Sequence, residues 1–155
     1  MKTKIIAIAA LVASFTFATA AEKIKAPNGG RIIDAVEPHA EFLITKDKKV
    51  EVRFLDDAGK VVAPAAQTVT VTMGDRAAPT KLAFTKDGDK LVSDKVIPEG
   101  KELPVVLQIK VTPEAKTVTE KFNLNLAKCP TCEHGEYACT CAHGGEEKGH
   151  EGHNH

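Results

Sequence analysis

Apolar and polar side chains alternate with a period of two over residues 29–126, the pattern of β-strands that bury one face. No stretch of this region carries the apolar stripe of an amphipathic helix. The pattern predicts seven or eight short strands, of which the clearest lie at residues 38–45, 50–55, 67–73, 81–85, 90–93, 105–111 and 117–126.

Turn signals separate these strands, at residues 56–59, 87–89 and 112–115. Many short strands at regular spacing predict an all-β fold, an Ig-like antiparallel β-sandwich of 7–8 strands. The chain has no Trp and its strands contain no cysteine, so the disulfide and packed Trp of antibody domains are absent. The topology therefore stays open, and an open barrel is the alternative.

The first predicted strand places two polar side chains on its outward face. His39 and Glu41 lie there, opposite the apolar Ala40, Phe42 and Ile44. A pair of this kind supplies metal ligands in some proteins, but a solvated strand face explains it more simply.

The N-terminal twenty residues have the layout of a secretory signal peptide. Lys2 and Lys4 precede an apolar run at residues 5–12, and Ala18 and Ala20 occupy the positions that a signal peptidase requires. We therefore expect residues 1–20 to be removed and the protein to be secreted, in a bacterium to the periplasm. The apolar run is too short to span a bilayer, so we expect no membrane insertion after cleavage.

Composition argues against several classes of function. The chain after residue 20 has nineteen basic and twenty-one acidic residues, a net charge of −2, and therefore lacks the basic face that nucleic acid requires. No hydrolase, metalloprotease or nucleotide-binding motif occurs, and Ser93 is the only serine beyond the predicted signal peptide. We expect neither nucleic-acid binding nor catalysis.

The composition changes abruptly at Lys128, which divides the secreted chain into a sandwich domain, 21–127, and a tail, 128–155. Residues 129–155 contain four Cys, five His, five Glu and five Gly, with Tyr137 as the only large apolar residue. Such a segment buries too little apolar surface to offset its ordering entropy, so we expect it to be largely disordered without metal.

The tail holds every cysteine of the protein, at spacings suited to one metal ion. A Cys-Pro-x-Cys pair brings two sulfurs to one side of a turn, and a second pair follows within ten residues. Thiolates select Zn(II) or Cu(I), and imidazoles suit Zn, Cu or Ni. The predicted metal ligands are Cys129, Cys132, Cys139, Cys141, His134, His143, His150, His153 and His155.

Disulfide bonds are the main alternative, because four cysteines in an oxidising compartment often pair. Pairing Cys129 with Cys132 and Cys139 with Cys141 closes two very small rings, the second of them strained, which stabilise a chain little. A thiol–disulfide redox role for Cys129 and Cys132 ranks below both, since such motifs usually begin a helix.

Three short motifs carry a family resemblance. Pro27-Asn28-Gly29-Gly30-Arg31, His39-Ala40-Glu41-Phe42 and Val52-Arg53-Phe54-Leu55-Asp56-Asp57 resemble small periplasmic β-sandwich modules that accompany, or are fused to, periplasmic adaptor subunits of heavy-metal efflux systems. The resemblance covers residues 26–93, with Asn28 where many members have His. It implies a role in heavy-metal handling at the cell envelope, with an efflux adaptor as partner.

The leading hypothesis is therefore a periplasmic accessory protein that sequesters Zn(II) or Cu(I) on its tail, or passes it to an efflux adaptor. A chelating tail that orders on binding surrenders its ligands one at a time to an acceptor. The alternative is a non-catalytic interaction module of the envelope whose sandwich docks a partner by a strand edge, with a solvating or disulfide-bonded tail.

Overall fold

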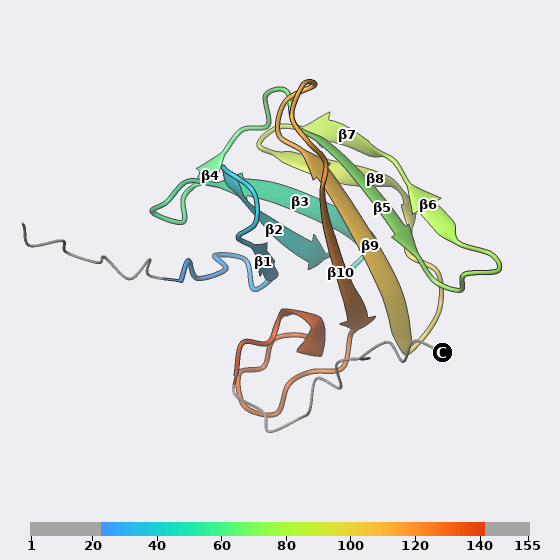
Figure 1. The fold of residues 1–155 in the computed structure, drawn as a ribbon. Helices are drawn as coiled ribbons and strands as arrows, with labels where there is room; N and C mark the ends of the chain where they lie inside the picture. The colour runs from blue at the N-terminus through green and yellow to red at the C-terminus, as the bar shows by residue number, and fades with distance from the viewer. Residues whose placement is uncertain (1–22, 142–155) are drawn as a thin grey trace, which may run out of the picture.

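Two antiparallel β-sheets form the protein in the computed structural model, which describes residues 23–141 (Figure 1). The predicted signal peptide and the predicted ligands His143, His150, His153 and His155 lie outside the described residues. Within residues 23–141, no helix is long and apolar enough to cross a membrane. The all-β, sandwich-like architecture that the alternation predicts is confirmed.

The first sheet contains six strands. Five follow the order β1-β2-β3-β8-β7, and β4 pairs with the end of β3, beyond the part of β3 that pairs with β8. The strands are β1 (Arg31–Ile33), β2 (His39–Ile44), β3 (Lys49–Leu55), β4 (Val61–Val62), β7 (Phe84–Asp87) and β8 (Lys90–Val96).

The second sheet contains four strands in the order β10-β9-β5-β6. They are β5 (Thr68–Met73), β6 (Thr80–Leu82), β9 (Glu102–Lys110) and β10 (Val118–Asn125). Alternate side chains of both sheets point into one shared core, in which Phe42, Val52 and Leu107 are fully buried. The period of two therefore produces the burial that holds the sheets together.

The predicted turns have the backbone geometry that their residues favour. Gly59 and Gly88 both adopt a positive φ, 74° and 62°, which an L side chain rarely takes. In the last turn the Ala115 amide donates to the Thr112 carbonyl oxygen at 3.1 Å. These three turns join β3 to β4, β7 to β8 and β9 to β10.

Ten strands are present among the described residues, against the seven or eight predicted. β1 and β4 are short additions, and the strand predicted at residues 81–85 is divided at Ala83 between the two sheets. Asp94 fixes this division: its backbone amide donates to the Ala83 carbonyl at 2.9 Å, and its carboxylate accepts from the Ala83 amide at 3.0 Å.

A β-bulge interrupts the pairing of β3 with β8 between Lys49 and Glu51. The Val50 amide donates to the Ser93 hydroxyl oxygen at 3.0 Å, and that hydroxyl donates in turn to the Lys95 carbonyl at 2.7 Å. Ser93 is buried, so its hydroxyl supplies the hydrogen bond that a regular ladder would give Val50.

Glu41 differs from the expectation of a solvated strand face, because it is fully buried. The segment before β1 covers it, and its carboxylate accepts hydrogen bonds from the amides of Asn28 and Gly30, each at 2.9 Å, and from the Asn28 side chain at 2.8 Å. Gly30 must be glycine here, because a Cβ at this position would lie 2.5 Å from the Phe42 carbonyl oxygen. Glu41 is thus a structural clamp for the N-terminal segment.

Candidate metal centre

The cysteines lie in a compact loop that follows β10. An isolated bridge joins Lys128 to Gly135, and the Cys129 amide donates to the His134 carbonyl at 2.8 Å. Between them the Glu133 amide donates to the Cys129 carbonyl at 3.1 Å, with Glu133 itself at a φ of 60°. Residues 129–133 therefore form the tight turn that the Cys-Pro-x-Cys spacing predicts.

Tyr137 fastens this loop to the sandwich. It lies in a short 3-10 helix (Glu136–Ala138), is buried, and makes an edge contact with Phe42 at a centroid distance of 6.1 Å. Its phenol oxygen accepts from the Ile44 amide at 3.1 Å, and its carbonyl accepts from the Arg31 guanidinium at 3.2 Å. The loop therefore has a covalent connection to β10 and a packed connection to β2.

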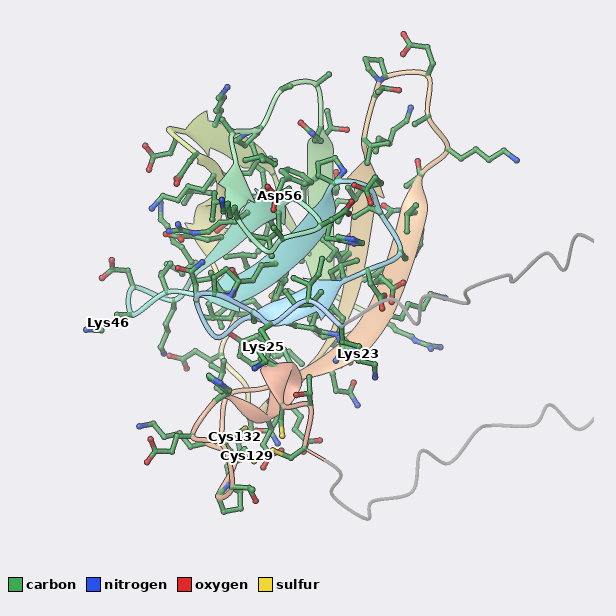
Figure 2. All side chains as sticks on the ribbon, turned by 90° about the vertical axis from the view of Figure 1, so that its left-hand side faces the viewer. Lys23, Lys25, Lys46, Asp56, Cys129 and Cys132 are labelled. Atoms are coloured by element: carbon green, nitrogen blue, oxygen red, sulfur yellow. The ribbon has the colours of Figure 1, made fainter. Side chains whose placement is uncertain are left out.

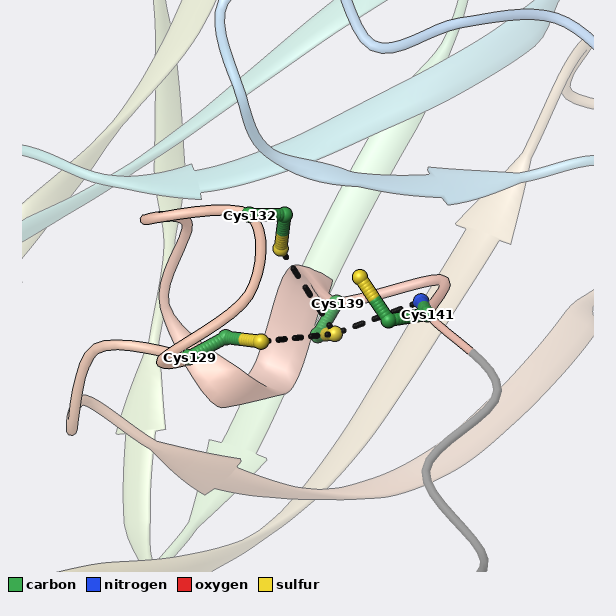
Figure 3. A group of neighbouring side chains, drawn as sticks. All are labelled: Cys129, Cys132, Cys139 and Cys141. Carbon is green, nitrogen blue, oxygen red and sulfur yellow. Dashed lines mark hydrogen bonds between the residues drawn. The ribbon is translucent and has the colours of Figure 1, made fainter.

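The loop brings all four sulfur atoms together (Figure 3). The Sγ atoms of Cys129, Cys132, Cys139 and Cys141 lie within 4.8 Å of one another, and all four residues are thiols. Cys139 is central, with its sulfur 3.4 Å from that of Cys129 and 3.6 Å from that of Cys132. The group can hold a metal ion.

These separations are in the range that four ligands of one ion require. Zinc–thiolate bonds of about 2.3 Å place the four sulfurs of a tetrahedron about 3.8 Å apart. The two closest contacts, 3.4 and 3.6 Å, lie near this value, and the remaining sulfur separations do not exceed 4.8 Å. Four sulfur ligands also leave no open coordination position, as in structural rather than catalytic zinc sites.

Backbone amides point at two of the sulfurs. The Thr131 amide donates to Cys129 Sγ at 3.4 Å, and the Cys141 amide donates to Cys139 Sγ at 3.3 Å. Both donors lie two residues after the sulfur that they reach. Hydrogen bonds of this kind stabilise a thiolate, so each cysteine pair is oriented to carry negative charge toward a cation.

The pKa values of two thiols rise in this group. Desolvation is the main cause for Cys139 and raises its pKa to about 12, with hydrogen bonds to the neighbouring thiols adding to the effect. Hydrogen bonding with Cys132 raises the pKa of Cys141. Burial and mutual contact thus favour neutral thiols, and a divalent cation reverses this preference because thiolates are its ligands.

The four cysteines differ in their access to solvent. Cys129 is 1% exposed, whereas Cys132, Cys139 and Cys141 are half-buried. Solvent therefore reaches Cys132, Cys139 and Cys141 more readily than Cys129.

The structure does not bring His134 into the sulfur group, although the sequence predicted it as a ligand. Its side chain is exposed and lies against Gly29, where an added Cβ would approach His134 Nδ1 to 2.9 Å. Sequence reasoning also missed the docking role of Tyr137. The available signal was that Tyr137 is the one large apolar side chain of a polar segment, a position that favours packing against the core.

Residues 128–141 are thus a defined loop with its own contacts to the sandwich. The dependence of this order on a bound metal, which the tail composition predicts, stays a prediction. Comparison with protein-family models, with curated proteins and with solved structures finds no match. The geometry of the thiol group and the sequence pattern therefore carry the functional argument.

Proposed function

We propose that this protein is a non-catalytic, periplasmic metal-binding protein that holds one soft or borderline ion, Zn(II) or Cu(I), on four cysteine thiolates. The observation that carries the proposal is the meeting of four Sγ atoms within 4.8 Å of one another in a loop beyond the sandwich. The spacing of these sulfurs favours Zn(II), since a tetrahedral four-sulfur set is the usual zinc arrangement.

The sandwich and the loop have separate tasks in this proposal. The sandwich is a stable base, and Tyr137 holds the loop against it through Phe42 and the Ile44 amide. The buried Cys129 retains the ion, while the half-buried Cys132 and Cys141 are the ligands that an incoming acceptor displaces first. Metal transfer by stepwise ligand exchange requires this kind of one-sided access.

The cellular setting follows from the sequence. A secretory signal peptide directs the chain to the periplasm, and the resemblance to modules of heavy-metal efflux systems makes an efflux adaptor the proposed acceptor. Storage and delivery of a toxic ion fit a protein with a closed thiolate site, because the site lacks the open coordination position of a catalytic metal.

The test is a zinc competition titration of the chain from Ala21, reduced, against a chromophoric chelator. We expect the unmodified protein to bind one Zn(II), and Co(II) substitution to give the strong thiolate charge-transfer absorption of a four-sulfur site. Replacement of the four cysteines by serine should abolish tight binding. Thr140→Ser is the matched control, because Thr140 is exposed and lies between two of the ligands without belonging to the sulfur group.

Equal zinc affinity of the unmodified and four-serine proteins would reject the proposal. So would natively purified protein whose sulfurs are all oxidised and that takes up no zinc or copper after reduction. Amide NMR spectra of the four-serine variant separate loss of ligands from loss of the fold, because none of the four cysteines lies in a strand.

A further inference from the structure

Three further ligand groups converge away from the cysteines. Glu37 precedes β2, His39 begins β2, and Asp57 lies in the turn after β3. The pairing of His39 with Leu55 across β2 and β3 brings Asp57, two residues beyond Leu55, next to the imidazole. His39 Nε2 lies 3.5 Å from Glu37 Oε2 and 3.6 Å from Asp57 Oδ1, and the three ligand atoms lie within 4.8 Å of one another.

These distances are longer than those of hydrogen bonds and agree with the separation of ligands around an ion. Good N–H···O hydrogen bonds measure about 2.7–3.2 Å, so neither carboxylate is close enough for one. Zinc bonds of about 2.0–2.2 Å to nitrogen and oxygen place tetrahedral ligand atoms about 3.4 Å apart, close to both measured distances.

The surrounding structure orients the His39 imidazole, fixes the turn that carries Asp57 and leaves both carboxylates accessible to solvent. His39 Nδ1 is buried and has no hydrogen-bond partner among the described residues, so Nε2 is the nitrogen that an ion can reach. The Asp56 carboxylate accepts from the Ala58 amide at 3.0 Å and the Lys60 amide at 2.9 Å, which fixes the turn that carries Asp57. The Glu37 and Asp57 side chains are 70% and 87% exposed, so an ion can enter directly and keep water ligands.

We propose that Glu37, His39 and Asp57 form a second, open metal site for a borderline divalent ion. One imidazole and two carboxylates suit Zn(II), Ni(II) or Cu(II), whereas Cu(I) prefers sulfur. The site is independent of the thiol group, because His39 and Ile44, the contact of Tyr137, are at opposite ends of β2, about 17 Å apart at 3.3–3.4 Å per residue. Figure 2 likewise separates Asp56, the neighbour of Asp57, from Cys129 and Cys132.

The test uses paramagnetic Ni(II) as the probe on the full chain from Ala21 with its four cysteines replaced by serine, so that thiols contribute nothing. In amide NMR spectra we expect Ni(II) to broaden residues 37–40 and 55–59 at low equivalents. His39→Gln should remove this broadening and leave the rest of the spectrum unchanged. His134→Gln is the matched control, because His134 is exposed and belongs to neither ligand group.

Asp57→Asn is a second variant that keeps the test valid if His39→Gln perturbs folding, since the Asp57 side chain is largely exposed. It should lower the Ni(II) affinity of the site around His39 by at least about tenfold. Removal of a group that only orients a metal ligand already lowers metal affinity about 10–100-fold. Broadening confined to residues 142–155, or equal broadening around His39 in both variants and the parent, would overturn the proposal, because Glu37, His39 and Asp57 would then not hold the ion. Because the cysteines are absent from the sample, neither result bears on the thiol site.

Discussion

The phenol oxygen of Tyr137 accepts a hydrogen bond from the backbone amide of Ile44, 93 residues earlier in the chain, at 3.1 Å. β1 pairs with β2 only from Ala40 to Phe42, so Ile44 lies beyond the end of that ladder. Tyr137 thus takes the place of a strand partner, and the cysteine loop completes an edge of the sandwich.

Tyr137→Phe should therefore lower the free energy of unfolding by about 1 kcal/mol, because it removes the acceptor of the Ile44 amide and keeps the ring. Tyr137→Ala should cost about 3 kcal/mol or more, since it also removes the packing against Phe42. Urea denaturation of both variants measures the difference. Equal stability of the two variants would show that the ring contributes nothing to docking.

The burial of Tyr137 also predicts that the stability of the fold depends on pH. Desolvation raises the pKa of its phenol above 10.0, so the folded protein favours the neutral form more than the unfolded chain does. The resulting stabilisation is fully present below pH 10 and is lost as the pH rises through the folded pKa. Tyr137 is the only tyrosine and the chain has no Trp, so phenolate absorbance reports this group alone. A titration midpoint at or below pH 10 in the folded protein would contradict the prediction.

Removal of metal should release the loop before the sandwich unfolds. On the proposed function, a chelator excess removes the ion that the four sulfurs share and leaves Cys139 and Cys141 with raised pKa values, so we expect Tyr137 to become solvent-exposed while core amides stay protected. Tyrosine fluorescence quenching and hydrogen exchange measure the two effects. If Tyr137 remains equally protected from the quencher after chelation, the loop is docked without metal.

Single cysteine replacements should differ in their effect on zinc affinity. Removal of a group that only orients a metal ligand lowers metal affinity about 10–100-fold. Because Cys129 is itself a proposed ligand, Cys129→Ser should lower the zinc affinity by more than about 100-fold. We expect Cys141→Ser to lower the zinc affinity less than Cys129→Ser does, and to speed the transfer of zinc to a chelator. The reason is that Cys141 is half-buried, whereas Cys129 is buried. Chelator competition and stopped-flow transfer rates rank the variants. Faster transfer from Cys129→Ser than from Cys141→Ser would reverse the proposed order of release.

Substitutions of Glu41 test whether its carboxylate holds the N-terminal segment in place. Glu41→Gln keeps one acceptor oxygen for the two backbone amides and should cost about 1–2 kcal/mol through loss of charge-assisted bonds. Glu41→Leu leaves both amides without an acceptor and should cost at least about 2 kcal/mol. Thermal and urea unfolding measure both, with the exposed Glu99→Gln as control. Unchanged stability of Glu41→Leu would mean that the segment does not depend on the carboxylate.

Local alternation predicted most of the strands, because burial of one face dictates a period of two. It did not predict the division at Ala83, since the hydrogen bonds that turn the chain there come from Asp94, eleven residues away. It placed Glu41 toward solvent for the same reason: the Asn28 and Gly30 amides that cover it arrive from another part of the chain. Contacts of this range have no signature in a strand pattern.

The two candidate metal sites differ in the same way: one could be predicted from local sequence and the other could not. The spacing of Cys129, Cys132, Cys139 and Cys141 is local, and the meeting of these four sulfurs agrees with the sequence prediction. The partners of His39 depend on the pairing of β2 with β3, so Glu37 and Asp57 became apparent only in the folded chain.

The bulge at Lys49 and Glu51 has a consequence for folding fidelity. Only one alignment of β3 against β8 lets the Ser93 hydroxyl reach the Val50 amide. A slip of β3 by one residue would leave the Val50 amide without an acceptor. It would also turn the side chains of Val50, Val52 and Phe54 toward water. The single serine of the described chain therefore discriminates against mispaired forms of the first sheet, and its loss should raise the yield of aggregates on refolding.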